Sequence, residues 1–497
     1  MRRATVAIAV LLAIAAGAAA ADRPWTLLRS EHLTVIGLES PKTLQRIAVE
    51  LERFRAVVGG LIQNAQRPLP LPTHVYVFDS RKQLQPFQPV RGGRVASLAG
   101  YFHHDTEVNA IALALENYDE SAPVVFHEYT HLLVANAARS VPVWLNEGLA
   151  EYYSTYALEA DGTRAHIGRP IAHHVALLRE RFIPLSQLIA VDTESVLYNE
   201  GERRSIFYAE AWALTHFLMI EMPNGPAAIN TYASGIARGD TPDDAFRGAF
   251  GSAPAEFEQQ LRRYIQQSKF RSIVLTMGER VNVETPERGR EMSAGEAGAW
   301  LGDLQRRIGR RAEATTRIEA AAKAEPAASM PELALGLLRL DAGRADEAWA
   351  AFESAVAAAP NDFFAQFSYG VARLRHQAAN APVRPAPAIA RAREALTRAA
   401  AINPSSSEAF AWLAYAEMMT DGRLRDARAA IEKAIELAPG RVDYRLRYAD
   451  IWILEGKIDE ATALLTGLAK VKTDKAAVEG ATRRLEAIAR LRRWKKG

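Results

Sequence analysis

The pattern of apolar and polar residues changes twice along the chain. Between Trp25 and about Leu115, short runs rich in β-branched and aromatic residues, such as "HLTVIG" (32–37) and "THVYVFDS" (73–80), surround one long helical pattern. From Ser121 to about Phe270 the apolar residues recur at helical spacing. Short strands alternating with helices predict an α+β domain with a small mixed sheet, and the later segments predict helices packed beside it.

The C-terminal part of the chain repeats with a period of about 34 residues. Prolines suited to closing helices are separated by 34, 44 and 35 residues, at Pro326, Pro360, Pro404 and Pro439. Glycines suited to turns are separated by 34, 79 and 34 residues, at Gly309, Gly343, Gly422 and Gly456. One unit therefore carries an insertion, which we place near 376–387.

Segments such as "AGRADEAWAAFESAVAAAP" and "DGRLRDARAAIEKAIELAP" resemble the second helix and closing proline of the tetratricopeptide repeat. The resemblance implies about five units over residues 293–475, stacked as an all-α right-handed solenoid. Such a solenoid has a concave surface. That surface could bind a protein partner or could pack on the first domain, and the sequence leaves both open.

The N-terminus predicts export. Residues 1–21 combine Arg2 and Arg3 with a short apolar run and a tail of small residues, the pattern of a signal peptide cleaved before Asp22. A membrane anchor is the alternative, and the shortness of the apolar run weakens it. We therefore expect a periplasmic or secreted protein without a transmembrane segment after cleavage.

Composition limits the chemistry. The chain has no cysteine, which excludes disulfides, thiolate catalysis and sulfur-ligated zinc, so any metal must bind His, Asp or Glu. A formal net charge of +3, from 61 basic and 58 acidic residues, does not indicate a surface that binds nucleic acid. The only basic run falls in residues 476–497, where we expect a solvated helix end.

The clearest chemical signal is "VVFHEYTHLLVANAARSVPVWLNEGLAEYY", residues 124–153. His127 and His131 are four residues apart, so on a helix they lie one turn apart on one face and can bind one cation. Glu128 follows the first histidine, where its carboxylate can act on a water bound to that metal. The alternative is a pair of buried histidines bonded to backbone carbonyls.

Both helices of this motif carry start signals. Ser121 as N-cap and Pro123 in the first turn indicate the start of the first helix. Pro142 indicates the start of the second, which we expect to turn back antiparallel to the first. Gly148 in the second helix would let the two helices approach closely enough for a metal to bridge them.

A catalytic zinc normally has three protein ligands and one open position, so a third ligand is needed. The second helix offers Glu147 and Glu151, one turn apart. One carboxylate would be the ligand, and the other could accept the second N–H of a ligating histidine. The residues alone leave open which carboxylate plays which part.

HExxH followed by "WLNEGLAEY" resembles the gluzincin metallopeptidases, which include thermolysin and the zinc aminopeptidases, and most closely the bacterial peptidase MA-like families. The resemblance implies Zn²⁺ bound by His127, His131 and Glu147, with Glu151 bonded to a ligating histidine. Only 15 residues lie between His131 and Glu147, a shorter interval than in thermolysin, so Glu151 stays the alternative ligand.

The resemblance also implies the reaction, hydrolysis of a peptide bond by a zinc-bound water with Glu128 as general base. Tyr208 resembles in placement the tyrosine that stabilises the oxyanion in the aminopeptidases, although a packed tyrosine would fit the same pattern. The segment "NAIALAL" (109–115), in two predicted strands or a hairpin over residues 100–115, resembles the edge strand that aligns an extended substrate, although a plain buried strand would look the same. His103 and His104 are expected at the surface of the preceding turn.

The sequence therefore predicts a signal peptide (1–21), a gluzincin-like domain (22–275), a linker (276–292), the repeats (293–475) and a basic helix (476–497). The expected function is that of an exported zinc metallopeptidase acting on a peptide or protein. No motif for a free substrate amine is visible, which favours endopeptidase over aminopeptidase action. The alternatives are an envelope scaffold acting through its repeats, and hydrolysis of a non-peptide amide at the same site.

Overall fold

A computed structural model describes residues 23–62, 65–91, 94–95, 100–116, 118–137, 141–192, 195–199, 206–380, 386–470 and 475–494. The predicted signal peptide lies outside these residues. Among the helices that are described, none is long and apolar enough to cross a membrane.

A six-stranded mixed sheet is the base of the N-terminal domain, with strand order β11-β1-β2-β3-β7-β6. The strands β2, β3 and β7 are parallel neighbours, and the other pairings are antiparallel. Every residue of β3 and β7 is buried, because both faces of the sheet are covered. The strands are β1 (Thr26–Arg29), β2 (Leu33–Gly37), β3 (Thr73–Phe78), β6 (Gly100–His104), β7 (Asn109–Ala114) and β11 (Arg290–Glu291).

The predicted hairpin over residues 100–115 is present as β6 and β7, but the prediction that its second strand is the sheet edge was wrong. β7 lies between β3 and β6, and β6 is the edge strand. A continuous apolar run such as that of β7 is typical of a central strand. His103 and His104 lie in β6 itself, half-buried and exposed respectively, rather than in a turn.

Two helices cover the face of the sheet that leads to the motif. They are α1 (Pro41–Leu61) and α3 (Tyr118–Ala137), which share one apolar core with β2, β3 and β7. Phe54 of α1 stacks on Phe126 of α3, with ring centroids 4.5 Å apart. This packing fixes α3 against the sheet.

The start of α3 differs from the prediction. The helix begins at Tyr118, so Pro123 lies inside the helix and not in its first turn. Proline lacks a backbone N–H, so at this position α3 loses one of its hydrogen bonds. The side chain of Ser121, the predicted cap, lies outside the described side chains.

A helical lobe follows α3 and packs around buried aromatic residues such as Trp144, Trp212 and Phe246. A small sheet, β8 (Ala157–Leu158), β9 (Arg164–Ile167) and β10 (Ile273–Thr276), lies beside it. The main helices of the lobe are α4 (Val143–Ser154), α5 (Ala172–Glu180), α6 (Leu185–Ile189), α8 (Ile206–Ile220), α9 (Gly225–Arg238), α10 (Pro242–Phe250) and α11 (Pro254–Ile265).

The close approach at Gly148 joins α4 to α8, which corrects the prediction that it joins the two motif helices. A Cβ atom at Gly148 would lie 2.1 Å from Oγ1 of Thr215 and 2.4 Å from the backbone oxygen of Ala211. Both atoms belong to α8. Gly148 therefore lets α4, the second motif helix, pack closely on α8.

The C-terminal region is the predicted solenoid of five helix pairs followed by α22 (Lys475–Trp494). The four predicted turn glycines all adopt positive φ, between 75° and 82°, a conformation that favours glycine. The predicted insertion lengthens the third pair, and its residues 381–385 lie outside the description. The pairs are α12 (Ala294–Arg307) with α13 (Arg311–Ala324), α14 (Ser329–Asp341) with α15 (Ala345–Ala358), α16 (Phe363–Asn380) with α17 (Ala386–Ile402), α18 (Ser407–Met418) with α19 (Leu424–Leu437), and α20 (Val442–Leu454) with α21 (Ile458–Leu468).

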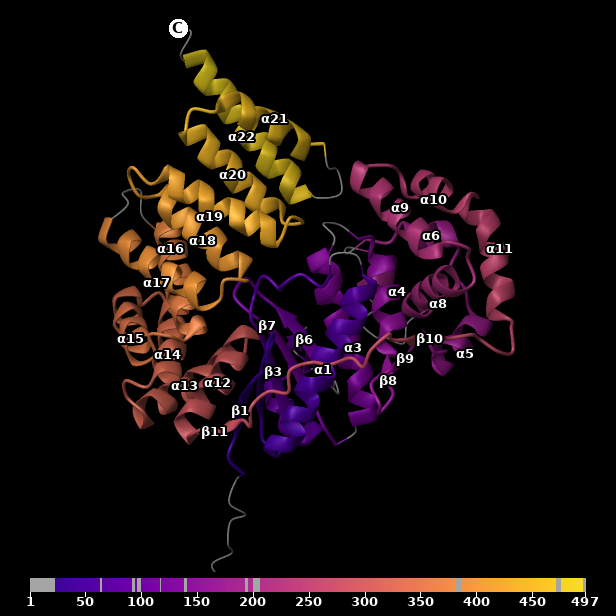
Figure 1. The fold of residues 1–497 in the computed structure, drawn as a ribbon, viewed down its shortest axis with the longest axis horizontal. Helices are drawn as coiled ribbons and strands as arrows, with labels where there is room; N and C mark the ends of the chain where they lie inside the picture. Colours follow the sequence, from indigo (N-terminus) through magenta and orange to yellow (C-terminus); the bar gives the residue numbers. More distant parts are fainter. Residues whose placement is uncertain are drawn as a thin grey trace, which may run out of the picture.

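The repeats curve around the face of the sheet opposite α1 and α3 (Figure 1). His74 of β3 contacts the rings of Trp300 in α12 and Phe364 in α16, each with centroids 4.9 Å apart. One hydrophobic cluster contains residues of the sheet and of the first three repeats. Of the two possibilities left open by the sequence, this part of the inner surface packs on the first domain. The predicted linker takes part as well, because β11 pairs with β1.

A buried ion-pair network fixes the β6–β7 turn to the repeats. Arg307 of α12, only 1% exposed, lies 2.7 Å from Asp303 and pairs with Asp105 in the turn. Glu107 in the same turn lies 3.4 Å from Arg307 and 3.0 Å from Arg375 of α16. Burial acts to raise the pKa of Asp105, but the guanidinium of Arg307 and two backbone N–H groups lower it to about 2.

Replacing Arg307 by Met should destabilise the protein, because the carboxylate of Asp105 then loses its buried cation and that of Asp303 keeps only Arg306. We expect a loss of about 3–5 kcal/mol in the free energy of unfolding, measured by chemical denaturation. The control is Arg344→Met, whose pair with Glu347 is 3.5 Å long and exposed, and which should cost less than about 0.5 kcal/mol. Equal losses in the two variants would contradict the structural role of the network.

Candidate metal centre

The structure brings His127, His131 and Glu147 together between α3 and α4. The Nε2 atoms of the two histidines are 3.0 Å apart, and Oε2 of Glu147 lies 3.3 Å from each of them. His127 and Glu147 are each 3% exposed. Within the described part of the chain, this is the group of metal-ligating residue types whose ligand atoms all lie within 4.8 Å of one another.

The three donor atoms fit a tetrahedral zinc ion. Ligands about 2.0–2.1 Å from a tetrahedral zinc lie about 3.3 Å from each other, which is close to the triangle described above. Oε2 of Glu147 is buried and has no aligned hydrogen-bond donor among the described residues. A buried carboxylate oxygen facing two imidazole nitrogens is what a cation at the centre of the triangle would compensate.

The electrostatics keep Glu147 ionised. Burial acts to raise the pKa of Glu147, but the close contacts with His127 and His131 and their charge outweigh it and hold that pKa well below its usual range. A carboxylate must be deprotonated to bind a metal, so Glu147 is in the form that a ligand requires.

Glu151 lies behind His127 rather than in the triangle. Its Oε1 is 3.3 Å from Nδ1 of His127, the nitrogen that faces away from the other ligands. Burial acts to raise the pKa of Glu151, but the charge of His127 and contacts with His127 and His174 lower it to about 2. This geometry favours Glu147 as the third ligand and Glu151 as the partner of His127, and both roles stay predictions.

His174 extends this chain of contacts and was not predicted. It lies in α5, is fully buried, and its Nε2 is 3.3 Å from Oε2 of Glu151. The centre consists of His127, His131 and Glu147. From His127 the contacts continue outward to Glu151 and then to His174. No fixed spacing from the motif identifies His174, because it comes from a different helix of the lobe.

The predicted catalytic residues occupy two helices. Glu128 is half-buried on α3, next to His127, and its role as general base stays a prediction. Tyr208 is half-buried on α8 and packs edge-on against Phe207, with centroids 5.5 Å apart. Tyr198 in the short helix α7 (Val196–Asn199) donates a 3.2 Å hydrogen bond to Oε1 of Glu147. The role of Tyr208 at the oxyanion stays a prediction.

The fold and the centre define a class of protein, an α+β domain with a candidate metal centre of His and Glu followed by a helical-repeat solenoid. Comparison with protein families agrees with this class. Residues 60–267 match the model described as Peptidase MA superfamily, and residues 418–485 match the model described as Tetratricopeptide repeat. The chain therefore carries a Peptidase MA superfamily domain and C-terminal tetratricopeptide repeats, which confirms the resemblance found in the sequence.

No curated protein matches the chain significantly. Among solved structures, MamA from Desulfovibrio magneticus RS-1 is similar at 18% identity and a TM-score of 0.31, over 37% of this chain and 98% of that one. A thermophilic tetratricopeptide protein of Thermus thermophilus is similar at 20% identity and a TM-score of 0.30, over 39% of this chain and 99% of that one. Pseudomonas aeruginosa PilF is similar at 17% identity and a TM-score of 0.30, over 41% of this chain and 93% of that one.

Single substitutions distinguish the two glutamates. Glu147→Ala should abolish stoichiometric zinc binding, because it removes a ligand atom. Glu151→Ala should retain the site but weaken zinc affinity about 10–100-fold, because only the orientation of His127 is lost. Zinc content after dialysis and competition with a chelator measure both effects. The reverse ranking of the two variants would make Glu151 the ligand.

Proposed function

We propose that the protein is an exported zinc metallopeptidase that hydrolyses peptide bonds at the centre formed by His127, His131 and Glu147. The observation that carries the proposal is the triangle of donor atoms next to Glu128, within a Peptidase MA superfamily domain. Export rests on the sequence of residues 1–21 alone, and a periplasmic or extracellular location follows from it.

Different residues of the chain would have separate roles in hydrolysis. When bound, zinc would lower the pKa of a water molecule and polarise the scissile carbonyl. Glu128 would take the proton of the attacking water and deliver it to the leaving amine. Tyr198 holds Glu147 by a hydrogen bond, and the same hydroxyl can turn to donate to the oxyanion that forms on the carbonyl.

The edge strand β6 is the element on which an extended substrate would be aligned. A strand at the edge of a sheet has backbone groups available for pairing with a peptide. β6 also packs beside α3, the helix that carries His127 and His131. We therefore assign to β6 the aligning role that the sequence suggested for its neighbour, and we keep endopeptidase action as the favoured mode.

Glu128→Gln tests the proposal with an almost isosteric change. The variant should keep its zinc and lose peptide cleavage by about 10²–10⁴-fold, because the amide cannot accept the proton. Zinc content and cleavage of a broad peptide library are measured for both proteins. A wild type without stoichiometric zinc would refute the proposal, and zinc-loaded proteins that are equally inactive would favour the scaffold function.

A matched pair of substitutions tests the two tyrosines. Tyr198→Phe should lower kcat about 10²-fold if its hydroxyl stabilises the oxyanion, with little change in zinc content. Tyr208→Phe removes the same atom from the neighbouring helix and should leave kcat nearly unchanged. The opposite result would return the role to Tyr208.

A further inference from the structure

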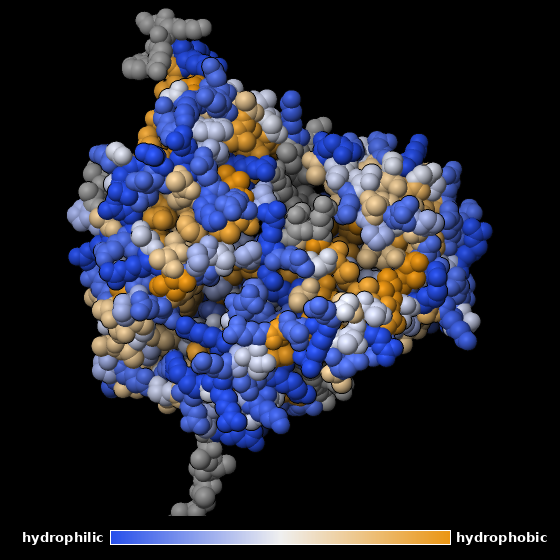
Figure 2. Space-filling view, viewed as in Figure 1, coloured by the Kyte–Doolittle hydropathy of each residue, from blue (hydrophilic) through white to orange (hydrophobic). Residues whose placement is uncertain are grey.

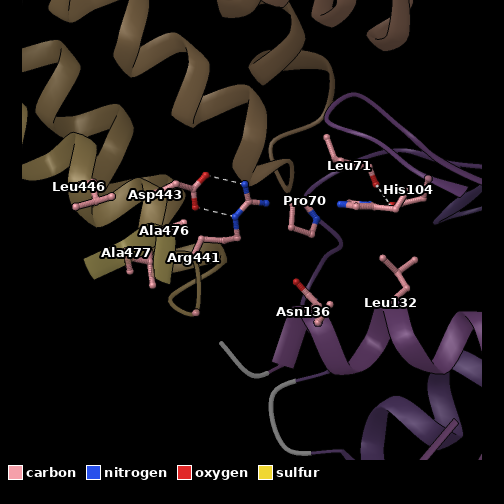
Figure 3. Close-up of a pocket in the computed structure, with 14 residues that line it drawn as sticks. Pro70, Leu71, His104, Leu132, Asn136, Arg441, Asp443, Leu446, Ala476 and Ala477 are labelled. Atoms are coloured by element: carbon pink, nitrogen blue, oxygen red, sulfur yellow. Dashed lines mark hydrogen bonds and ion pairs between the residues drawn. The ribbon is translucent and has the colours of Figure 1, made fainter. Parts of the chain in front are cut away.

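A pocket of about 360 Å³ lies where the N-terminal domain meets the last repeats. Figure 3 shows its two sides, with the end of α3 and the segment around Pro70 and His104 facing Arg441 and Asp443 of the repeats. On the molecular surface, Figure 2 shows hydrophobic residues on the upper repeats and on the helical lobe. The pocket therefore has walls from both domains.

The pocket opens on the face of α3 that carries Glu128. Leu132 and Ala135 line it and follow Glu128 by one and two helical turns, so the three residues share one side of the helix. At a rise of about 1.5 Å per residue, Ala135 lies about 10 Å along the axis from Glu128. An extended peptide advances about 3.3 Å per residue, so the pocket is about two or three residues from a bond cleaved at Glu128.

The edge strand leads to the same pocket. His104 is the last residue of β6, and both His104 and Asn109 line the pocket. The ring of His104 is held by a 2.7 Å hydrogen bond between its Nδ1 and the side-chain oxygen of Asn109. A peptide paired along β6 would leave the strand beside His104 and enter the pocket.

The lining indicates a neutral, apolar occupant. Leu71, Leu132, Val442 and Leu446 form most of the apolar wall, together with alanines from α3 and α22. Arg441, the cation of the lining, is paired with Asp443 through bonds of 2.9 and 2.7 Å and lies 2.6 Å from Glu408. Because Arg441 is already engaged by two carboxylates, the described lining offers no free cation to an acidic side chain.

We propose that this pocket binds a large apolar side chain of the polypeptide substrate, two or three residues from the scissile bond. The fifth repeat and α22 then form one wall of the substrate cleft, so the repeats take part directly in substrate selection. This inference rests on the proposed peptidase function. The pocket volume of about 360 Å³ is at the lower end of the range for ligand pockets, which suits a side chain better than a folded partner.

The test fills the pocket from the side of the repeats. Ala476 of α22 is exposed and lines the pocket, so Ala476→Phe should block the pocket while every residue of α3 and every metal ligand stays unchanged in sequence. Ala489→Phe is the control, because Ala489 is exposed on the same helix but does not line the pocket. Zinc content and the thermal midpoint are checked for both variants.

The probe is a set of blocked peptides that carry Leu or Phe in place of Ala at each position in turn. Wild type should prefer Leu or Phe at one position, two or three residues from the cleaved bond. Ala476→Phe should lower kcat/KM for those peptides about 10–100-fold and leave the alanine peptides nearly unchanged. Ala489→Phe should behave as wild type.

Binding to an inactive background separates this proposal from the proposed function. Fluorescent peptides are titrated into Glu128→Gln with and without Ala476→Phe. Cleavage by the wild type with selectivity unaffected by Ala476→Phe would overturn the pocket proposal and leave the peptidase standing. Binding that depends on Ala476 without any cleavage would overturn the peptidase and keep the peptide site. Neither binding nor cleavage would overturn both.

Discussion

The arrangement of the N-terminal domain depends on how one buried carboxylate, that of Glu147, is compensated. An ionised carboxylate removed from water is costly unless opposite charge or hydrogen-bond donors surround it. His127 and His131 face one oxygen and Tyr198 donates to the other. Together these contacts require α3, α4 and α7 to converge at one point. Gly148 makes this possible from behind, since it lets α4 pack against the backbone of α8.

The repeats are an integral part of this fold rather than an appended module. Their inner helices share a hydrophobic cluster with the sheet, and Arg307 joins them to the β6–β7 turn through buried ion pairs. The part of the inner surface that packs on the sheet is therefore occupied by the chain itself. A protein partner recognised by the tetratricopeptide repeats has to use their remaining surface. Such a partner would contact repeats that are packed directly on the sheet of the N-terminal domain.

The sequence predicts features whose signals are local, and it misses features that depend on tertiary packing. The spacing of His127 and His131 and the glycines of the repeat turns encode their own geometry, because one helical turn or one positive φ decides it. Tyr198 contacts Glu147 and His174 contacts Glu151, each from a separate element, so no spacing identifies them. The edge position of β6 was missed for a related reason: the apolar run of β7 is typical of a central strand, but it does not identify which strands lie on either side of it.

The order of the contacts suggests how the two domains cooperate. The β6–β7 turn is held by Arg307, and β6 ends at His104, which lines the pocket shared with the last repeat. The first repeats thus fix one end of the edge strand, while the last repeat closes the space beyond it. Under the proposed function, a peptide would run along α3 past Glu128 towards this space. A solenoid that only recruited partners would need neither contact. The presence of both supports the proposal that the repeats shape a cleft for a peptide substrate.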